Sequence, residues 1–408
     1  MKYPIYKNLF FEADIEIFRG RTKVTSRGIL APLLRTRVSR EMSFFDNQKY
    51  IFELMPDSDM DNEHANYLNR YGSSLIFSTW MAPIPSPAFS RQVKSRMMSG
   101  FGCFHPEQVT LSITEECPNR CLHCALPNKN NHSKLSPTEV KDAIDQCVAA
   151  GATNIIFDGG EPLGYAGLED LISHVPETAV AGLFTSGVGL TFEKAKSLKD
   201  AGLYSISVSF DSPFEEKHDH MRGVAGIFKK AAAGVKNAVS AGLLVNMYVV
   251  LAPYNVSDLE DFYRLSQELG AHELSFYEIV PTGRWLDNTS DILTKDQHAA
   301  FESFVRRHER DGDAKDSQNI DSGPKIFPGP LIVQTFGCMA GRQWLHITPE
   351  GNILPCSCVP ISYGNIKDGK NAVKTAWKKI RKDPAYGKIG GCLMRDKDFR
   401  EKYGDKFE

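Results

Sequence analysis

The 408-residue sequence lacks a long apolar run and lacks a strong excess of charge of either sign. No window approaches the roughly 20 consecutive apolar residues of a membrane span, and the start, Met1 to Ile5, lacks the apolar core of a secretory signal. The formal net charge of −2 argues against a general nucleic-acid-binding protein, which usually has a basic excess. With 42% hydrophobic and 24% charged residues, the composition is that of an ordinary globular protein. We therefore expect a cytoplasmic protein with no membrane span and no nucleic-acid partner.

Most of the nine cysteines lie in two groups instead of being scattered, which fits a reducing cytosol better than a disulfide framework. The first group is Cys117-Pro-Asn-Arg-Cys121-Leu-His-Cys124, directly after an alternating apolar run that predicts a β-strand. Closely spaced thiolates are typical of iron–sulfur clusters, whereas a structural zinc site normally closes with four ligands. Three thiolates leave one position open to an outside molecule. A zinc site that recruits a distant fourth ligand is the alternative.

The middle of the chain repeats a short apolar strand followed by an amphipathic helix that ends at a glycine. Such helix ends are predicted at Gly151, Gly202, Gly242 and Gly270, because glycine adopts the left-handed conformation of a helix C-cap without strain. Ser136 with Glu139, and Ser257 with Glu260, predict capping boxes at two helix starts. The strands are expected at 108–114, 154–160, 180–187, 204–211, 243–250 and 273–280.

Six strands alternating with helices predict parallel βαβ units and an α/β fold. The fold that we expect is a partial (β/α)6 TIM-like barrel with an N-terminal α+β extension and a small C-terminal cluster-binding domain. A doubly wound open sheet is the alternative. In either fold the chemistry is expected at the carboxyl ends of the strands.

Several motifs follow those strand ends. In Asp158-Gly159-Gly160-Glu161-Pro162, the glycines allow close approach of a ligand to the backbone, and the carboxylate can receive an ammonium group. The other motifs are Thr185-Ser186-Gly187, Ser209-Phe210-Asp211, His218-Asp219-His220-Met221-Arg222-Gly223 and Pro281-Thr282-Gly283-Arg284.

Together with the three cysteines, these motifs resemble those of the radical S-adenosylmethionine (SAM) enzymes. The resemblance implies a [4Fe–4S] cluster on Cys117, Cys121 and Cys124, with SAM bound at its open iron. It implies that Gly159, Gly160, Glu161 and Pro162 hold the amino group of the SAM methionine moiety, that Ser186 and Ser209 contact the SAM ribose or carboxylate, and that Arg222 pairs with the carboxylate. A surface ion pair is the alternative for Arg222. We interpret His123 as an adenine-stacking or packing residue that points away from the cluster.

The second cysteine group comprises Cys338, Cys356, Cys358 and Cys392. Residues 344–355 read as strand, Pro-Glu-Gly-Asn turn and strand, a β-hairpin that would bring Cys338 and Cys356 together. The arrangement resembles the twitch domain, a shortened SPASM domain that carries one auxiliary [4Fe–4S] cluster, and a helix near Trp377 fits it. A closed zinc site is the alternative. The Cys-x-Cys spacing makes Cys358 the least secure ligand.

The remaining cysteines have simpler interpretations. Cys147 shares an apolar helix face and is predicted to lie in the core, and Cys103 is interpreted as a packing residue. In the first hundred residues, a hairpin is expected around Arg19-Gly20 and a strand at Tyr50 to Leu54. A basic helix from Ser90 to Met98 is interpreted as a solvated face rather than an anion-binding one.

The predicted domains are an N-terminal α+β extension and candidate substrate-binding region (1–105), a radical SAM core barrel (106–285), a linker with one helix (286–330) and a twitch/SPASM-like domain (331–408). By resemblance, the chain is a radical SAM oxidoreductase of the maturase type. It would cleave SAM to a 5′-deoxyadenosyl radical that abstracts hydrogen from a peptide, protein or cofactor precursor, with a reductant such as ferredoxin or flavodoxin as partner. The alternatives are the same chemistry on a lipid or small metabolite, and a non-catalytic iron–sulfur electron-transfer protein. An electron carrier would not need a SAM pocket.

Overall fold

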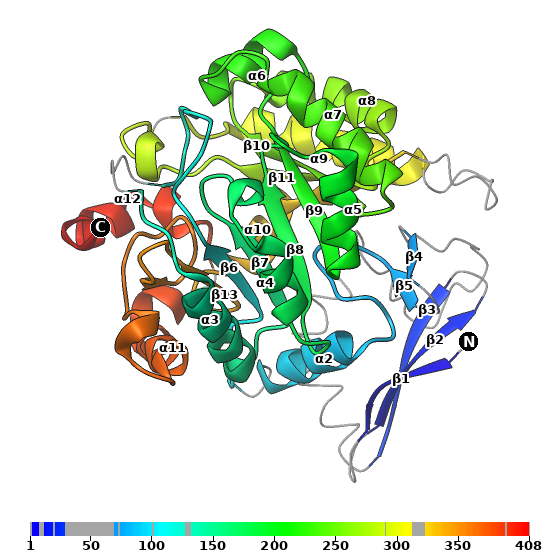
Figure 1. Ribbon diagram of the computed structural model, residues 1–408, viewed down its shortest axis with the longest axis vertical. Helices are drawn as coiled ribbons and strands as arrows, with labels where there is room; N and C mark the ends of the chain where they lie inside the picture. The colour runs from blue at the N-terminus through cyan, green and yellow to red at the C-terminus, as the bar shows by residue number, and fades with distance from the viewer. Residues whose placement is uncertain are drawn as a thin grey trace.

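A nine-stranded sheet organises the computed structural model, in the order β12-β11-β10-β9-β8-β7-β6-β13-β14 (Figure 1). The structure describes residues 2–7, 12–18, 21–28, 69–71, 74–99, 102–126, 132–289, 291–311, 323–387 and 390–407. The strands of the large sheet are β6 (Gln108–Ser112), β7 (Asn154–Asp158), β8 (Val180–Thr185), β9 (Leu203–Phe210), β10 (Leu244–Leu251), β11 (Glu273–Glu278), β12 (Lys325–Pro328), β13 (Trp344–Ile347) and β14 (Ile353–Leu354).

Strands β6 to β11 are parallel neighbours in sequence order, and they coincide with the six predicted strands to within a few residues. The predicted partial TIM-like α/β fold is therefore confirmed. The helices are α2 (Pro87–Ser99), α3 (Pro137–Ala150), α4 (Leu168–His174), α5 (Phe192–Asp200), α6 (Glu215–Arg222), α7 (Ile227–Ser240), α8 (Leu259–Leu269), α9 (Lys295–Asp311), α10 (Gly329–Phe336), α11 (Ala372–Lys382) and α12 (Lys397–Tyr403).

One of the two predicted capping boxes is present. The Ser136 side chain accepts a hydrogen bond from the Glu139 amide, and the Glu139 carboxylate accepts from the Ser136 amide at 2.7 Å. The box at Ser257 was wrong: a 3-10 turn spans Val256–Asp258, and α8 begins only at Leu259. Ser257 lies inside that turn and not at the start of α8, and its hydroxyl donates to the Asp258 carboxylate at 3.1 Å.

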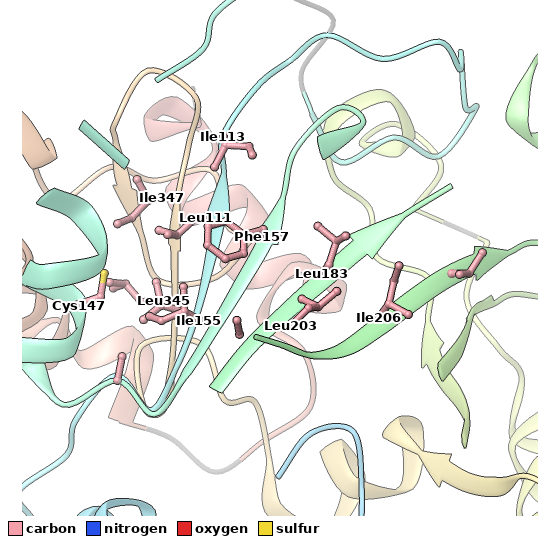
Figure 2. Packing of buried hydrophobic residues seen from close by; sticks show 14 of the residues in the cluster. Leu111, Ile113, Cys147, Ile155, Phe157, Leu183, Leu203, Ile206, Leu345 and Ile347 are labelled. Carbon is pink, nitrogen blue, oxygen red and sulfur yellow. The ribbon is translucent and has the colours of Figure 1, made fainter. Parts of the chain in front are cut away.

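The two faces of the sheet differ in chemistry because successive side chains of a strand point to opposite faces. On the face covered by helices lie apolar residues such as Leu111, Ile155 and Ile206, with Cys147 fully buried among them as predicted (Figure 2). We call the opposite side the inner face. Small polar and aromatic residues occupy most of the alternate positions there, beside a few others such as Ile156 and Glu273: Thr110, Ser112, Asn154, Phe184, Ser205, Ser207, Ser209, Asn246, Tyr248, Ser275, Tyr277 and Trp344.

The segment 77–81, before the predicted barrel, closes the amino-terminal end of the inner face. The Trp80 indole packs against Phe184 and Tyr277, with ring centroids 5.8 and 5.5 Å away, and its Nε1 donates to Ser275 Oγ at 3.0 Å. The Thr79 amide and hydroxyl both donate to the buried Glu273 carboxylate. We call this segment the floor. The sequence does not predict it, because a single tryptophan in a loop produces no periodic pattern.

The sheet also crosses the predicted domain boundaries. Strand β12 lies in the predicted linker and pairs in parallel with β11, while β13 lies in the predicted C-terminal domain and pairs in parallel with β6. The predicted hairpin is present as antiparallel β13 and β14. Strand β12 was not predicted from the sequence, because it has only four residues and ends in a proline.

The N-terminal region projects from one side of the molecule, opposite the C-terminal helices (Figure 1). Strands β1 (Lys2–Lys7), β2 (Glu12–Phe18) and β3 (Arg21–Arg27) form an antiparallel sheet, which confirms the hairpin around Arg19-Gly20, and β4 (Asn69–Tyr71) pairs with β5 (Ser74–Ile76). The strand predicted at 50–54 lies outside the described residues.

Helix α2 is not the solvated basic face that its sequence predicted. Arg96 is buried and its Nε lies 2.7 Å from the Glu107 carboxylate, while Arg91 bonds to the Val148 carbonyl. Lys94, the third basic residue of the helix, is exposed. The helix packs against the barrel because both arginines meet partners there.

The floor provides a stability test. We expect Trp80→Ala to lower the free energy of unfolding by about 3 kcal/mol, since truncating a packed tryptophan typically costs about 3–5 kcal/mol. Urea denaturation monitored by far-UV circular dichroism measures this change. Trp80→Phe keeps most ring contacts and loses the hydrogen bond to Ser275, so about 1 kcal/mol is expected. Equal stability of Trp80→Ala and the wild type would show that the segment is not a floor.

Candidate active site

The motifs predicted from the sequence meet at the carboxyl end of the parallel strands, where a strand-end site is expected. We call residues 114–125, which follow β6, the cluster loop. The Gly159-Gly160-Glu161-Pro162 segment follows β7, and Gly283-Arg284 follows β11. Backbone hydrogen bonds join both segments to the cluster loop, so the three motifs form one unit.

Close backbone contacts hold the two ends of the cluster loop. Gly160 N donates to Thr114 O at 2.6 Å and Glu161 N to Glu116 O at 2.8 Å. A Cβ on Gly160 would lie 2.3 Å from Glu116 O, so no larger residue fits without a shift. At the other end, Arg284 N donates to Cys124 O at 2.9 Å, and a Cβ on Gly283 would lie 2.3 Å from the same oxygen.

The three thiols of the cluster loop lie within electrostatic range of one another. The pKa of Cys117 is raised to about 12, chiefly by desolvation and also by the Glu161 carboxylate and the thiols of Cys121 and Cys124. The pKa of Cys124 is raised by the same kinds of cause. Because thiolates are the ligands of iron, a cluster that binds here must displace these protons, which couples its binding to proton release.

Glu161 is a buried carboxylate that meets four protein donors but no cation. Its oxygens accept from Thr185 Oγ1 at 2.6 Å, Ser186 Oγ at 2.5 Å, Ser186 N at 2.9 Å and Leu163 N at 3.2 Å. Desolvation raises its pKa, and in the described part of the chain no lysine or arginine forms an ion pair with it. A ligand ammonium group would supply the missing positive charge.

Three further residues predicted to bind SAM, Ser186, Ser209 and Pro162, lie beside the Glu161 carboxylate or on the inner face of the sheet. Ser186, at the end of β8, uses its hydroxyl to bond Glu161, so it orients that carboxylate in this structure. Ser209 lies on the inner face of β9 and is partly accessible. Pro162 begins the 3-10 turn Pro162–Gly164 that Glu161 caps. Contacts of these residues with SAM stay predictions.

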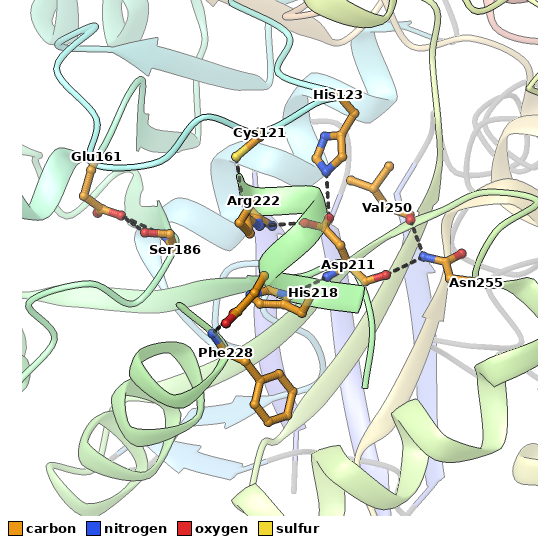
Figure 3. A network of polar contacts seen from close by, with 11 residues as sticks. Cys121, His123, Glu161, Ser186, Asp211, His218, Arg222, Phe228, Val250 and Asn255 are labelled. Atoms are coloured by element: carbon orange, nitrogen blue, oxygen red, sulfur yellow. Dashed lines mark hydrogen bonds and ion pairs between the residues drawn. The ribbon is translucent and has the colours of Figure 1, made fainter. Parts of the chain in front are cut away.

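Arg222 and His123 have protein partners that the sequence did not reveal (Figure 3). Arg222 Nε lies 2.6 Å from the carboxylate of Asp211, and His123 Nε2 lies 2.7 Å from the other oxygen of that carboxylate. Arg222 Nη1 also lies 3.7 Å from Cys121 Sγ. Arg222 is therefore a buried ion pair rather than a surface one, and His123 is a partner of Asp211 rather than simply a packing residue.

Asp211 stays ionised in this cluster despite its complete burial. Burial alone would raise its pKa, but Arg222 and then His123 hold the pKa well below its usual range. The pKa of the neighbouring His218 is lowered to about 4, chiefly by burial and then by Arg222. The carboxylate and the guanidinium therefore form a charged pair beside a neutral imidazole.

The C-terminal structure brings the four remaining predicted ligands together. Cys338 and Cys392 form one hydrogen-bonded thiol pair, Cys356 and Cys358 form another, and each pair interacts electrostatically with the other. Cys358, the least secure member by spacing, thus lies with the rest. In the described ranges, no three histidine, cysteine, aspartate or glutamate side chains converge as they would around a single metal ion.

Two inner-face residues join the cysteine groups and were not predicted as site residues. Asp158 is paired in register with Ser112, and desolvation raises its pKa to about 6. Tyr248 on β10 interacts electrostatically with both Asp158 and Cys358, and both residues are partly accessible. Asp158 directly precedes the Gly-Gly-Glu-Pro motif, and that position was the available sequence signal.

Comparison with known proteins identifies the core. Residues 111–266 match the Radical SAM superfamily. This segment is a radical SAM domain. The predicted recognition and the predicted enzyme class are therefore confirmed. No helix in the described ranges of this radical SAM enzyme is long and apolar enough to span a membrane.

The radical SAM enzyme also resembles individual proteins over stretches longer than the core. It is 26% identical over 309 residues to the AdoMet-dependent heme synthase of Oleidesulfovibrio alaskensis, covering 70% of this chain and 79% of that protein. It is 28% identical over 311 residues to the PqqA peptide cyclase of Bradyrhizobium diazoefficiens, covering 72% and 80%. Streptococcus suis SuiB bound to the precursor peptide SuiA shares the fold over 97% of both chains, with a TM-score of 0.59 and 13% identity.

The charge of Glu161 can be tested by Glu161→Gln, which keeps the shape of the side chain. A hydrogen bond to a charged group contributes about 1.5–3 kcal/mol, so SAM affinity should fall roughly ten- to a hundredfold. Anaerobic calorimetry measures the affinity, and the iron content should stay at the wild-type value. The matched control is Glu169→Gln, which removes a carboxylate that pairs with Lys194 at 2.7 Å. Unchanged affinity in Glu161→Gln would contradict an ammonium-binding role.

The close approach at Gly160 predicts a second effect. Gly160→Ala forces a Cβ against Glu116 O, and overpacking of this kind costs about 1–3 kcal/mol. We expect a lower midpoint temperature of unfolding and less iron retained after anaerobic reconstitution. Gly164→Ala is the control in the same segment, because a Cβ there meets nothing within 4 Å. Equal iron retention by the two variants would refute the close-contact argument.

Proposed function

We propose that this radical SAM enzyme modifies a peptide substrate, and that it uses one [4Fe–4S] cluster on the cluster loop and an auxiliary [4Fe–4S] cluster on the C-terminal cysteines. The observation that carries the proposal is the link between the two cysteine groups: Asp158 interacts electrostatically with Cys124 of the first group and with Tyr248, and Tyr248 interacts with Cys358 of the second. This arrangement would suit an enzyme that oxidises a substrate between two redox centres.

The residues present fit the groups that the family binds. Three thiols in electrostatic contact offer soft ligands for an iron–sulfur cluster, and the four C-terminal thiols offer a complete ligand set for a second one. Glu161 would hold the ammonium group of SAM. When bound, the cluster and SAM supply a radical that removes hydrogen from an unactivated carbon. The protein supplies orientation through the loop contacts, and exclusion of water through the closed floor at Trp80.

The chemistry of the inner face supports a peptide. Most of its side chains are small and polar or aromatic. The Glu273 carboxylate is buried against Thr79 at the floor, and Asp158 adds a partly accessible carboxylate. Such a surface suits a neutral or basic side chain in an extended peptide. The PqqA peptide cyclase and the peptide complex of SuiB, which matches nearly the whole chain, support the same class.

A tetrapyrrole is the second candidate, favoured by the similarity to AdoMet-dependent heme synthases. Its several carboxylates would require free cations near the site. Arg222 is paired with Asp211, and Arg395 is paired with Glu278 at 2.5 Å. These two guanidiniums are therefore committed to protein carboxylates. Arg284, which bonds to Cys121 O at 3.3 Å, forms no ion pair with a carboxylate among the described residues, and it is the cation that a tetrapyrrole carboxylate would meet.

The remaining assignments are part of this proposal. A reductant such as ferredoxin or flavodoxin would deliver electrons, and the cytoplasm would provide the reducing environment that clusters and free thiols require. The alternative of a non-catalytic electron carrier does not explain the buried, cation-free Glu161. The roles of the N-terminal extension in substrate binding and of the predicted domain boundaries stay predictions.

Iron analysis tests the two-cluster assignment. Wild-type protein reconstituted anaerobically should bind about eight irons, since each cubane holds four. Cys117→Ala should lose about four irons and all SAM cleavage. The combined variant Cys338→Ala, Cys356→Ala and Cys392→Ala should also lose about four but still cleave SAM. The control is Cys103→Ala. Cys103 was interpreted from the sequence as a packing residue, but the structure shows its thiol exposed, so its removal should keep the wild-type iron content. Four irons with one zinc in the wild type would overturn the auxiliary cluster.

Substrate class is tested by the formation of 5′-deoxyadenosine. Short peptides encoded beside the gene should stimulate it and should themselves change in mass. An iron-bound coproporphyrin is the comparison probe. Stimulation and conversion of the porphyrin, with no response to the peptides, would reverse the order of the two candidates.

A further inference from the structure

The centre of the cluster loop docks on the carboxyl end of α6. Arg120 N donates to Arg222 O and Leu122 N donates to Met221 O, both at 2.9 Å. A Cβ on Gly223 would lie 2.6 Å from Arg120 O, so the helix end and the loop are in direct backbone contact. The position of Cys121 therefore depends on the position of α6.

Asp211 is the group that ties α6 to the barrel. It follows β9 directly and is fully buried. Its amide donates to His218 Nδ1 at 3.1 Å, and its carbonyl accepts from Asn255 Nδ2 at 2.9 Å. The same Asn255 amide group donates to Val250 O at 2.9 Å, at the end of β10 (Figure 3). The backbone of Asp211 is therefore fixed by three elements before its side chain is considered.

The fixed carboxylate then holds the loop from two sides. One oxygen lies 2.7 Å from His123, which is between two cluster-loop cysteines, and the other lies 2.6 Å from Arg222. Arg222 in turn directs Nη1 to Cys121 Sγ at 3.7 Å. His123 and Arg222 cannot both move away from Cys121 without leaving a buried carboxylate unpaired, which is costly.

We propose that Asp211 is a positioning residue that holds Arg222 and His123 around Cys121 and thereby sets the electrostatic environment of the cluster. In this assignment, which rests on the proposed cluster at Cys117, Cys121 and Cys124, the guanidinium acts on the Cys121 sulfur rather than on the SAM carboxylate. Net charge and hydrogen bonds to the sulfurs are among the factors that set the reduction potential of such a cluster.

The assignment predicts shifts of opposite sign in the midpoint potential. Arg222→Leu removes a positive charge beside Cys121, disfavours the more negative reduced state, and should lower the potential. Asp211→Asn removes a negative charge from the same network and should raise it. An anaerobic redox titration, followed by electron paramagnetic resonance, measures both midpoint potentials. The protein used also carries Cys338→Ala, Cys356→Ala and Cys392→Ala, so that the signal comes from the cluster at Cys117, Cys121 and Cys124 alone.

Milder substitutions keep the proposal testable if Arg222→Leu or Asp211→Asn fails to fold. His123→Ala leaves the Asp211–Arg222 pair in place and should alter the resonance spectrum and reduce iron retention while the protein stays folded. Arg222→Lys keeps the charge and should return the potential toward the wild-type value. The matched control is Glu215→Gln on the same helix, whose carboxylate pairs with the exposed Lys229 at 2.9 Å. It should leave the potential unchanged.

The outcomes separate the assignment from the proposed function. If Arg222→Leu keeps the wild-type potential but binds SAM ten- to a hundredfold more weakly by calorimetry, the guanidinium serves the SAM carboxylate and the assignment is wrong. If Asp211→Asn and His123→Ala both match the wild type in iron content, spectrum and potential, it is also wrong. If Cys121→Ala retains the full iron content of its parent, no cluster is held there and the proposed function itself fails.

Discussion

The structure of the site depends on backbone contacts between the cluster loop and the ends of its neighbouring strands and helix. The loop carries three thiols, but its residues 114–125 form no helix or strand that could hold them. Its hydrogen bonds come instead from the segment after β7, from the end of α6 and from the segment after β11. Each contact occurs at a glycine where a Cβ would collide with a loop oxygen. Such contacts fix the loop more tightly than side chains could, because main-chain atoms of packed elements have little freedom.

A consequence of this anchoring is that the motifs predicted to bind SAM also join elements of the fold. Glu161 joins the end of β7 to the end of β8 through Thr185 and Ser186, and it is near Cys117 at the same time. Arg222 joins α6 to β9 through Asp211 while its guanidinium reaches Cys121. Both residues are buried and charged, so each needs an opposite charge. For Arg222 the protein provides it, whereas for Glu161 the described residues do not. The two motif positions therefore differ in their need for a ligand.

The inner face explains how one sheet can serve both cysteine groups. Parallel strands place their carboxyl ends at one edge, and β13 extends the sheet beside β6, which brings the C-terminal hairpin to that edge. The polar and aromatic side chains between the two groups are closed from below by Trp80. Desolvation on this face raises the pKa of Asp158, so its carboxyl group can exchange a proton near neutral pH.

The sequence by itself determined the parallel strands, most helix ends and the grouping of the cysteines, because these depend on local periodicity, on glycine conformation and on spacing along the chain. It named Gly160 and Gly283 within motifs, yet the oxygen atoms that exclude a Cβ there come from residues more than forty positions away in one case and far more in the other. The partners of Arg222 and His123, the register that places Asp158 beside Ser112, and the floor formed by Trp80 were decided only by the tertiary structure. Those features arise where segments distant in sequence meet, and burial then dictates which polar groups must pair. Local sequence patterns do not encode contacts between distant segments, so the partner of a motif residue is defined only by the folded structure.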